Sequence, residues 1–174
     1  MRASVPCVTS VGQVRPADVD DVDGIARVTV RSWRETYAGI LAEHHFDGGA
    51  YDRRREQWTR FFASDPPPGR LVVATVDGEV VGFACAGDAH AAEQGFPAAR
   101  PLHLYAIYVL AAHLGSGLGQ ALLDEVLDGA PAQLWVLRGN DRAIAFYTRN
   151  GFAADGVEFT DPDDPAMVEV RMVR

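Results

Sequence analysis

Apolar and polar residues repeat along the chain with two different periods, and these periods predict the order of its elements. A period of two, or a short continuous apolar run, predicts strands at residues 13–15, 71–76, 79–86, 102–109, 132–137, 152–159 and 167–173. Apolar residues spaced by three and four predict helices at residues 25–37, at 52–62, from 116 or 117 up to Gly129, and between Asn140 and Gly151.

Turn and cap residues mark the ends of these elements. Asp77-Gly78 between two β-rich runs predicts a two-residue hairpin turn. Asn140 is a typical N-cap residue, and Gly151 is a typical helix end. The resulting order, β-α-α-β-β-β-α-β-α-β-β, predicts an α+β (mixed α/β) domain built on one central sheet. Residues 1–12 show no periodicity, so we expect a flexible tail before a single domain at 13–174.

Composition narrows the class of protein. A chain of 174 residues suits one domain with a substantial core, and no apolar run approaches the ~20 residues of a membrane span. Two cysteines without a C-x-x-C spacing favour neither a disulfide framework nor a metal site, and they suit a reducing cytoplasm. The net charge of −8 argues against a nucleic-acid partner and mildly favours a cationic substrate.

Three alternating glycines stand between a buried strand and an amphipathic helix. Gly115, Gly117 and Gly119 leave a nearly bare backbone at a helix N-terminus, which suits an anion such as a pyrophosphate. A Walker loop is excluded because no Gly-Lys-Ser/Thr follows, and the Gly-x-Gly-x-x-Gly dinucleotide fingerprint does not fit in either register. The alternative is that the glycines only make a tight turn between strand and helix.

Two blocks of sequence together resemble the GNAT superfamily of N-acetyltransferases. The first block is Tyr105-Ala-Ile-Tyr-Val109 followed by Leu114-Gly-Ser-Gly-Leu-Gly119, which is similar to the pyrophosphate-binding signature of that family. The second runs from Asn140 to Phe152 and is similar to its Asn-x-x-Ala-x-x-Phe-Tyr-x-x-x-Gly-Phe block. The segment 31–40 also looks like one common near the start of bacterial members.

This resemblance implies a fold and a cofactor site. The expected fold is a central, mostly antiparallel sheet of six to seven strands with a V-shaped splay, flanked by about four helices. Acetyl-CoA would lie between the strand that ends at Val109 and the strand at 132–137. Backbone groups of Tyr108 and Val109 would pair with the pantetheine arm, and Asn140 and Ala143 would line its other side. The pyrophosphate would be held by the amides of Leu114, Gly115, Ser116, Gly117, Leu118 and Gly119.

The chain departs from the family pattern at two positions. Leu114 stands where the family usually has Gln or Arg, and Ser116 stands where a basic residue is frequent. We therefore expect a lower affinity for CoA. Arg142 either compensates for the missing positive charge or is a solvated surface residue. The same departures keep open a second hypothesis, a non-catalytic acyl-CoA-binding or regulatory module on this fold.

The resemblance also implies acetyl transfer to an amine by direct attack in a ternary complex. Tyr147 would protonate the leaving thiolate, since it stands seven residues past Asn140, or ~10 Å along a helix. Its alternative role is a packing aromatic. Alignment of the glycine turns puts His103 at the position of the base in histone-acetylating members, and its alternative is a buried strand histidine. The oxyanion donor would be the N–H near Val109.

The acceptor pocket is expected between the 33–40 segment, the 87–101 loop and the last strands. Candidate substrate-binding residues are Trp33, Glu35, Tyr37 and His90, with His44 and His45 as further titratable groups. A cationic small molecule or a peptide N-terminus is the expected acceptor. The sequence leaves a homodimer open.

Overall fold

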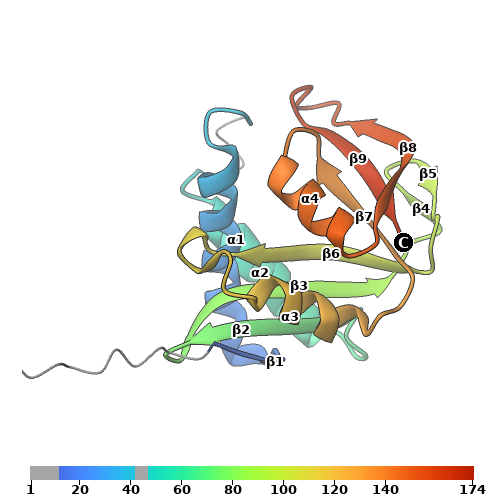
Figure 1. The fold of residues 1–174 in the computed structure, drawn as a ribbon. Coiled ribbons are helices and arrows are strands. Elements are labelled where there is room, and N and C mark those ends of the chain that lie inside the picture. Colours follow the sequence, from blue (N-terminus) through green and yellow to red (C-terminus); the bar gives the residue numbers. More distant parts are fainter. Residues whose placement is uncertain (1–11, 42–46) are drawn as a thin grey trace, which may run out of the picture.

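The computed structural model describes residues 12–41 and 47–174, and a seven-stranded sheet organises them (Figure 1). The strand order is β1-β2-β3-β6-β7-β9-β8, and every neighbouring pair is antiparallel except β6 and β7. The strands are β1 (Gln13–Pro16), β2 (Arg70–Val76), β3 (Glu79–Asp88), β6 (Leu102–Val109), β7 (Ala132–Leu137), β8 (Ala153–Thr160) and β9 (Val168–Val173). The expected fold class is therefore confirmed.

Helices cover both faces of this sheet. They are α1 (Val22–Tyr37), α2 (Ala50–Ala63), α3 (Leu118–Leu127) and α4 (Asp141–Arg149). One core cluster joins α1 and α2 to the sheet through residues such as Ile25, Trp58 and Phe83. A second cluster joins α3 and α4 to the opposite face through residues such as Leu122 and Phe152, and a small third one contains Leu41 and Leu137. None of the helices in the described ranges combines the length and apolar character that crossing a membrane requires.

Most element boundaries differ from the sequence-based ones by one or two residues, and the two largest differences have a structural reason. Helix α1 begins at Val22 rather than at Ile25, because a short 3-10 turn with a capping box at Asp18 leads directly into it. The predicted loop at 87–101 contains a small hairpin, β4 (Ala92–Glu93) and β5 (Phe96–Pro97). Strands of two residues are too short to leave a periodic pattern. Most of the expected tail, and also His44 and His45, lie outside the described residues.

The sheet opens between its two central strands. Strand β6 pairs with β3 along its whole length, but it pairs with β7 only at Leu102–Ala132 and His103–Gln133. Beyond these two pairs β6 continues to Val109 without pairing to β7. This is the V-shaped splay that the resemblance implied, and it leaves a cleft through the middle of the sheet.

Candidate active site

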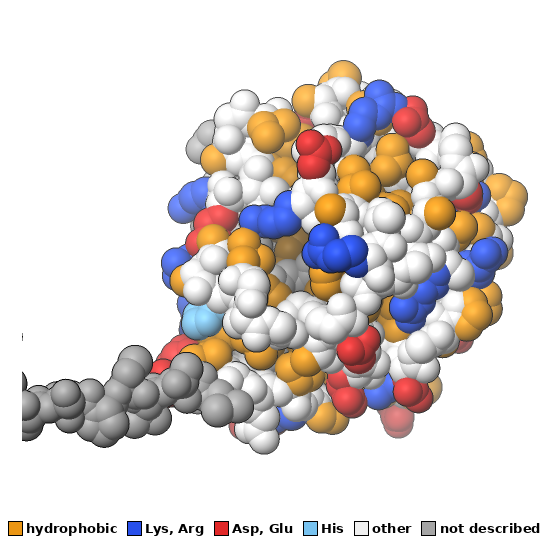
Figure 2. Space-filling model, viewed as in Figure 1, with side chains coloured by type: hydrophobic (Ala, Val, Ile, Leu, Met, Phe, Trp, Pro, Cys, Tyr) orange, Lys and Arg blue, Asp and Glu red, His pale blue; other side chains and the backbone are white. Residues whose placement is uncertain are grey.

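A cavity of about 440 Å³ occupies the splay and is lined from both faces of the sheet. Figure 2 shows its opening from the side of α3 and α4, with basic side chains at the edge. The α3 and α4 side contributes Gly117, Gly119, Ala143, Phe146 and Tyr147. The α1 and β9 side contributes Ser32, Trp33, Tyr37, Trp135, Met167 and Glu169. The cavity is therefore one continuous space whose two ends differ in chemistry.

The glycine turn forms one end of the cavity. Gly115 and Gly117 have φ of +77° and +88°, and an added Cβ at either would meet open space. These left-handed conformations require glycine and turn the chain into α3. Leu114 N and Ser116 N donate inside the preceding turn, and Leu118 N donates to Ser116 Oγ. The amides left for an anion are therefore those of Gly115, Gly117 and the residues of the first turn of α3 after Leu118. The Ser116 side chain also bonds within the turn and does not line the cavity.

Two arginines of α4 add positive charge at this end. Arg142 and Arg149 both line the cavity, and their spacing of seven residues puts them on one face of the helix. The sequence reading considered Arg142 and missed Arg149, although the i, i+7 spacing was visible. Leu114 also lines the cavity and is 41% exposed, but its side chain is apolar and contributes no charge there. Leu118 points into the core instead.

The free edge of β6 forms the wall between the two ends. Leu110 N donates to Val81 O. Because backbone groups alternate in direction along an antiparallel ladder, the N–H and C=O groups of residues 110 and 108 both point toward β3. The N–H and C=O groups of Ile107 and Val109 then point the other way, toward the cleft. Both residues line the cavity, where β7 is no longer paired to β6. An extended arm with amide groups could pair with this edge as a strand does.

Tyr147 lies at the centre of the cavity wall on α4. It is 8% exposed, and its ring packs edge-on against Phe146 and Phe152. Within the described ranges its hydroxyl has no recorded hydrogen-bond partner, while the residue lines the cavity. Burial raises the pKa of Tyr147 well above its usual value, and the neighbouring Tyr108 and Tyr37 add to the shift. The hydroxyl therefore keeps its proton at neutral pH and is available as a donor.

Asn140 joins α4 to α1 across the splay. Its Oδ1 accepts a hydrogen bond from Ala143 N at 3.2 Å and caps the helix. Its Nδ2 donates to the Tyr37 hydroxyl at 2.8 Å. Asn140 and Ala143 both line the cavity as expected, but their polar groups are already engaged in holding α4. We infer that they shape the site more than they bind through side-chain or amide hydrogen bonds.

Aromatic side chains form the opposite end. Trp33 Nε1 donates to the Tyr108 hydroxyl at 2.8 Å, and the Trp33 and Tyr37 rings lie 5.5 Å apart. Burial raises the pKa of Tyr108 to about 12, so this hydroxyl is also neutral. Leu41 and Met167 complete an apolar surface here.

Glu35 lines the cavity but is held by two partners. Its carboxylate accepts from Ala111 N at 3.0 Å and from Arg31 Nε at 2.8 Å. Partial burial disfavours its charge, but these bonds outweigh burial and lower the pKa of Glu35. The side chain thus ties α1 to the segment before the glycine turn, and it is poorly suited to take a proton from a substrate.

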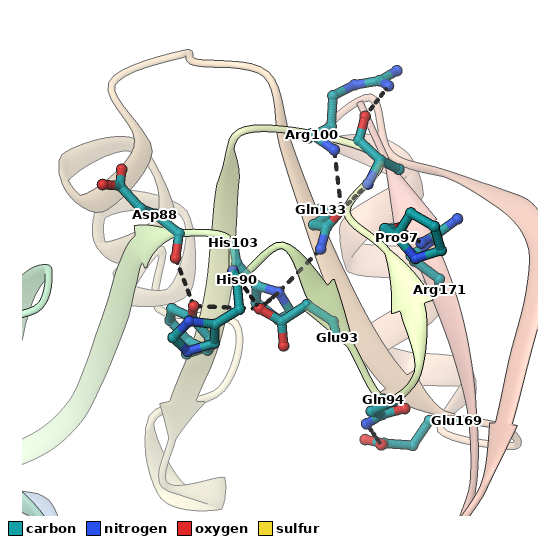
Figure 3. A network of polar contacts seen from close by, with 12 residues as sticks. Asp88, His90, Glu93, Gln94, Pro97, Arg100, His103, Gln133, Glu169 and Arg171 are labelled. Carbon is teal, nitrogen blue, oxygen red and sulfur yellow. Dashed lines mark hydrogen bonds and ion pairs between the residues drawn. The ribbon is translucent and has the colours of Figure 1, made fainter.

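His103 and His90 do not line the cavity, and both belong to the contacts around the β4–β5 hairpin (Figure 3). The exposed His90 takes part through its backbone N–H, which donates to Glu93, and through ring contact with Tyr105. His103 is 4% exposed and stacks on Tyr105 at 4.3 Å. Gln133 Oε1 accepts from Ala99 N and Arg100 N, so Gln133 Nε2 is turned to donate to His103 Nδ1 at 3.3 Å. Such a donor requires a neutral imidazole. Burial lowers the pKa of His103, and the nearby Glu93 opposes this only in part.

We expect His103 to make stability depend on pH. An unfolded histidine binds a proton below ~6.5, while the folded protein resists protonation of this buried ring. The free energy of unfolding should therefore fall as the pH drops through 6.5 toward the lower folded pKa. In urea unfolding at pH 7.5 and 5.5, the wild-type protein should lose more stability than His103→Gln, which keeps an acceptor and cannot titrate. Parallel pH profiles for the two proteins would contradict this role.

One carboxylate in the cavity was not found from the sequence. Glu169 on β9 lines the aromatic end and accepts from Gln94 Nε2 at 2.6 Å. Burial raises the pKa of Glu169, and the hydrogen bond from Gln94 only partly offsets this. A glutamate between valines in a final strand looks solvent-facing in the sequence, so no signal marked it.

Comparison with known proteins gives one consistent family. Residues 29–152 match the family described as the acetyltransferase (GNAT) family. An uncharacterized N-acetyltransferase of Bacillus subtilis, YuaI, is 34% identical over 83% of this chain and 84% of its own length. An uncharacterized N-acetyltransferase of Archaeoglobus fulgidus is 33% identical over 78% of this chain and 88% of its own.

Solved structures share the fold. The PaiA N-acetyltransferase of Thermoplasma acidophilum, determined in complex with coenzyme A, has a TM-score of 0.69 at 20% identity and covers 92% of this chain and 98% of its own. The ribosomal-protein-alanine N-acetyltransferase of Brucella melitensis has a TM-score of 0.68 at 24% identity, with coverage of 93% and 98%. At these identities the likeness establishes the architecture.

Proposed function

The chain belongs to the GNAT acetyltransferase family, and from this premise we propose that it transfers an acetyl group from acetyl-CoA to a primary amine. The acceptor is a small molecule or a peptide, and it attacks directly in a ternary complex. The observation that carries the proposal is the continuous cavity through the splayed sheet, with an anion-binding turn at one end and an aromatic pocket at the other. Such a cavity lets two substrates meet from opposite faces.

The residues present fit acetyl-CoA. Open glycine positions and unpaired amides at Gly115 and Gly117 suit a pyrophosphate, with Arg142 and Arg149 beside them. The free edge of β6 at Ile107 and Val109 suits the amide groups of the pantetheine arm. Acetyl-CoA supplies an activated carbonyl and a thiolate leaving group.

Two groups of the chain act on the acetyl transfer in this proposal. The Val109 N–H faces the cleft, where it stabilises negative charge on the carbonyl oxygen. The Tyr147 hydroxyl, which stays protonated, gives its proton to the departing sulfur. His103 is not carried into this mechanism, because it lies outside the cavity lining and is already bonded.

Calorimetry with acetyl-CoA, followed by a thiol-release assay with a panel of primary amines, tests the function. We expect saturable binding and release of free CoA with at least one amine. Binding without release across a broad panel would overturn the catalytic proposal and favour the non-catalytic acyl-CoA-binding module. We propose that the reaction takes place in the cytoplasm, which the composition of two cysteines, with Cys85 buried and free, supports.

A further inference from the structure

Glu169 is a carboxylate in the cavity wall to which no described residue supplies a counter-ion. Among the described residues it forms no ion pair, and its recorded side-chain partner is the neutral amide of Gln94. The arginine two positions along β9, Arg171, is committed to Asp155 at 2.7 Å and to Pro97 O at 2.7 Å. A charge that is partly removed from water is costly unless an opposite charge compensates it, so a cationic group that reaches this carboxylate is favoured.

The surroundings of Glu169 restrict what that cation can be attached to. The walls at this end are the aromatic rings of Trp33, Tyr37, Tyr108 and Trp135, with Leu41 and Met167. Arg54 already lies over the Trp33 ring and Arg171 over the Trp135 ring, so the aromatic faces of Tyr37 and Tyr108 are the ones that could attract an ammonium group. The apolar side chains suit a hydrocarbon body. Glu35 is the other carboxylate in the lining, and it is already paired with Arg31. A second or third ammonium group on the same acceptor would therefore lack a partner.

Gln94 holds Glu169 in position from the turn of the β4–β5 hairpin. In Figure 3 its side chain points toward Glu169 and away from the Glu93 and His103 cluster. Gln94 and Gly95 have φ of +52° and +83° and form the two-residue turn of this hairpin, which fixes where the Gln94 side chain starts. Its Oε1 is buried and lacks a partner among the described residues. Gln94 itself does not line the cavity, so its part is to hold the Glu169 carboxylate from behind while that side chain faces the open space.

We propose that Glu169 binds the acceptor as an ammonium ion and takes its first proton, and that the acceptor is a monoamine with an apolar body. This inference rests on the proposed acetyl transfer. Glu169 removes one proton from R–NH₃⁺, and the freed electron pair of nitrogen forms the C–N bond to the acetyl carbon. The C–S bond breaks, and the sulfur takes a proton from Tyr147. The tyrosine recovers it from the second proton that nitrogen loses, and Glu169 releases its own proton to water.

Thiol release by the wild-type protein and by Glu169→Gln, each with acetyl-CoA, tests this assignment. The panel contains hexylamine and phenethylamine as apolar monoamines, spermidine, glycine and a short peptide with a free N-terminus. We expect the apolar monoamines to have the highest kcat/KM, and the substitution to lower that value about 100-fold or more, in the range of acid–base catalysis. A highest kcat/KM for spermidine, glycine or the peptide would overturn the acceptor class, and an unchanged kcat/KM in Glu169→Gln would overturn the role of Glu169.

Matched variants separate binding from folding. Glu79→Gln removes a carboxylate at an exposed position of β3 and should change no kinetic value. Glu169→Asp restores a carboxylate and should recover part of the lost kcat/KM, while acetyl-CoA affinity stays the same in all three variants. No recovery in a folded Glu169→Asp protein that binds acetyl-CoA, with loss equal to Glu169→Gln, would assign Glu169 a purely structural role and overturn the proposal.

A binding measurement distinguishes failure of this inference from failure of the proposed function. Trp33 and Trp135 line the pocket, so hexylamine bound there should change tryptophan fluorescence of the CoA complex. If the wild-type protein releases no thiol with any amine, catalysis fails. Saturable quenching by hexylamine that Glu169→Gln abolishes would still support the amine site. Absence of quenching in the wild-type protein, or equal quenching in both, would overturn it.

Discussion

Replacing Tyr147 by phenylalanine is expected to lower kcat by about 10²- to 10⁴-fold, the range of a lost general acid. The hydroxyl lies in the cavity wall with no recorded partner in the described part of the chain, and burial raises its pKa. It therefore carries a proton across the whole physiological range and can deliver it to a leaving sulfur. The measurement is the rate of thiol release at saturating substrates.

The same variant should keep its fold and its affinity for acetyl-CoA. An unbonded hydroxyl can be removed from a packed ring at nearly no cost in the free energy of unfolding. Tyr51→Phe is the matched control, since the Tyr51 hydroxyl bonds Asp23 on the outside of α1 and α2. A loss of kcat below ~10-fold in Tyr147→Phe would reduce Tyr147 to a packing residue, because that is less than general acid catalysis supplies.

Placing a negative charge in the glycine turn is expected to weaken acetyl-CoA binding severely. Gly117 has φ of +88° and is the N-cap residue of α3. Aspartate and asparagine tolerate this left-handed conformation better than other side chains do. At ~5 Å and an effective dielectric of ~20, one repelling charge pair costs about 3 kcal/mol, or roughly 200-fold in Kd. Gly117→Asp should show this loss in calorimetry.

Gly117→Asn provides the neutral partner of that experiment. The two side chains have almost the same shape, so their difference in Kd isolates the charge. Gly78→Asp adds a charge and a side chain at φ of +81° in the distant hairpin turn, and it should leave Kd unchanged. Equal affinities of Gly117→Asp and Gly117→Asn would mean that the phosphates lie elsewhere.

Most of the fold could be predicted from the sequence, because its signals are local. The Asp77-Gly78 turn, the Asn140 cap and the apolar periods act within a few residues, and all of them appear in the structure. The β4–β5 hairpin escaped prediction because it depends on distant partners. Pro97 O, for example, accepts from Arg171 on β9.

The alignment that put His103 at the position of the base assumes a regular strand, but β6 contains a β-bulge. Pairing shifts between Cys85 and Ala86, so Tyr105 is an extra residue in β6. In a regular strand His103 would share a face with Ile107 and Val109. With the extra residue it shares the face of Tyr108, which does line the cavity, but His103 lies at the closed end of the splay, where it pairs with Gln133 and contacts the hairpin network. No feature of the sequence predicts this bulge.

The acceptor end could be predicted only in part, for a related reason. Trp33 and Tyr37 were visible as aromatic residues at the end of a helix, and both line the cavity. Glu169 and Trp135 come from strands that meet only through the order β7-β9-β8. Which side chains of these strands face the cleft is a property of tertiary pairing, and single-sequence periodicity does not contain it.

The two residue pairs that join β6 to β7 are the strand pairing between two units of the described sheet, and one core cluster also packs across both units. One unit is the half-sheet from β1 to β6 with α1, α2 and α3, and the other is β7, β9 and β8 with α4. Few backbone bonds cross this seam, so the units are held together mainly by the side chains of that cluster and by any ligand that contacts both walls. A ligand that bridges both walls closes the seam, and its concentration then sets how often the chain is exposed to proteases. The half-life of the protein under proteolysis should therefore increase with the concentration of that ligand.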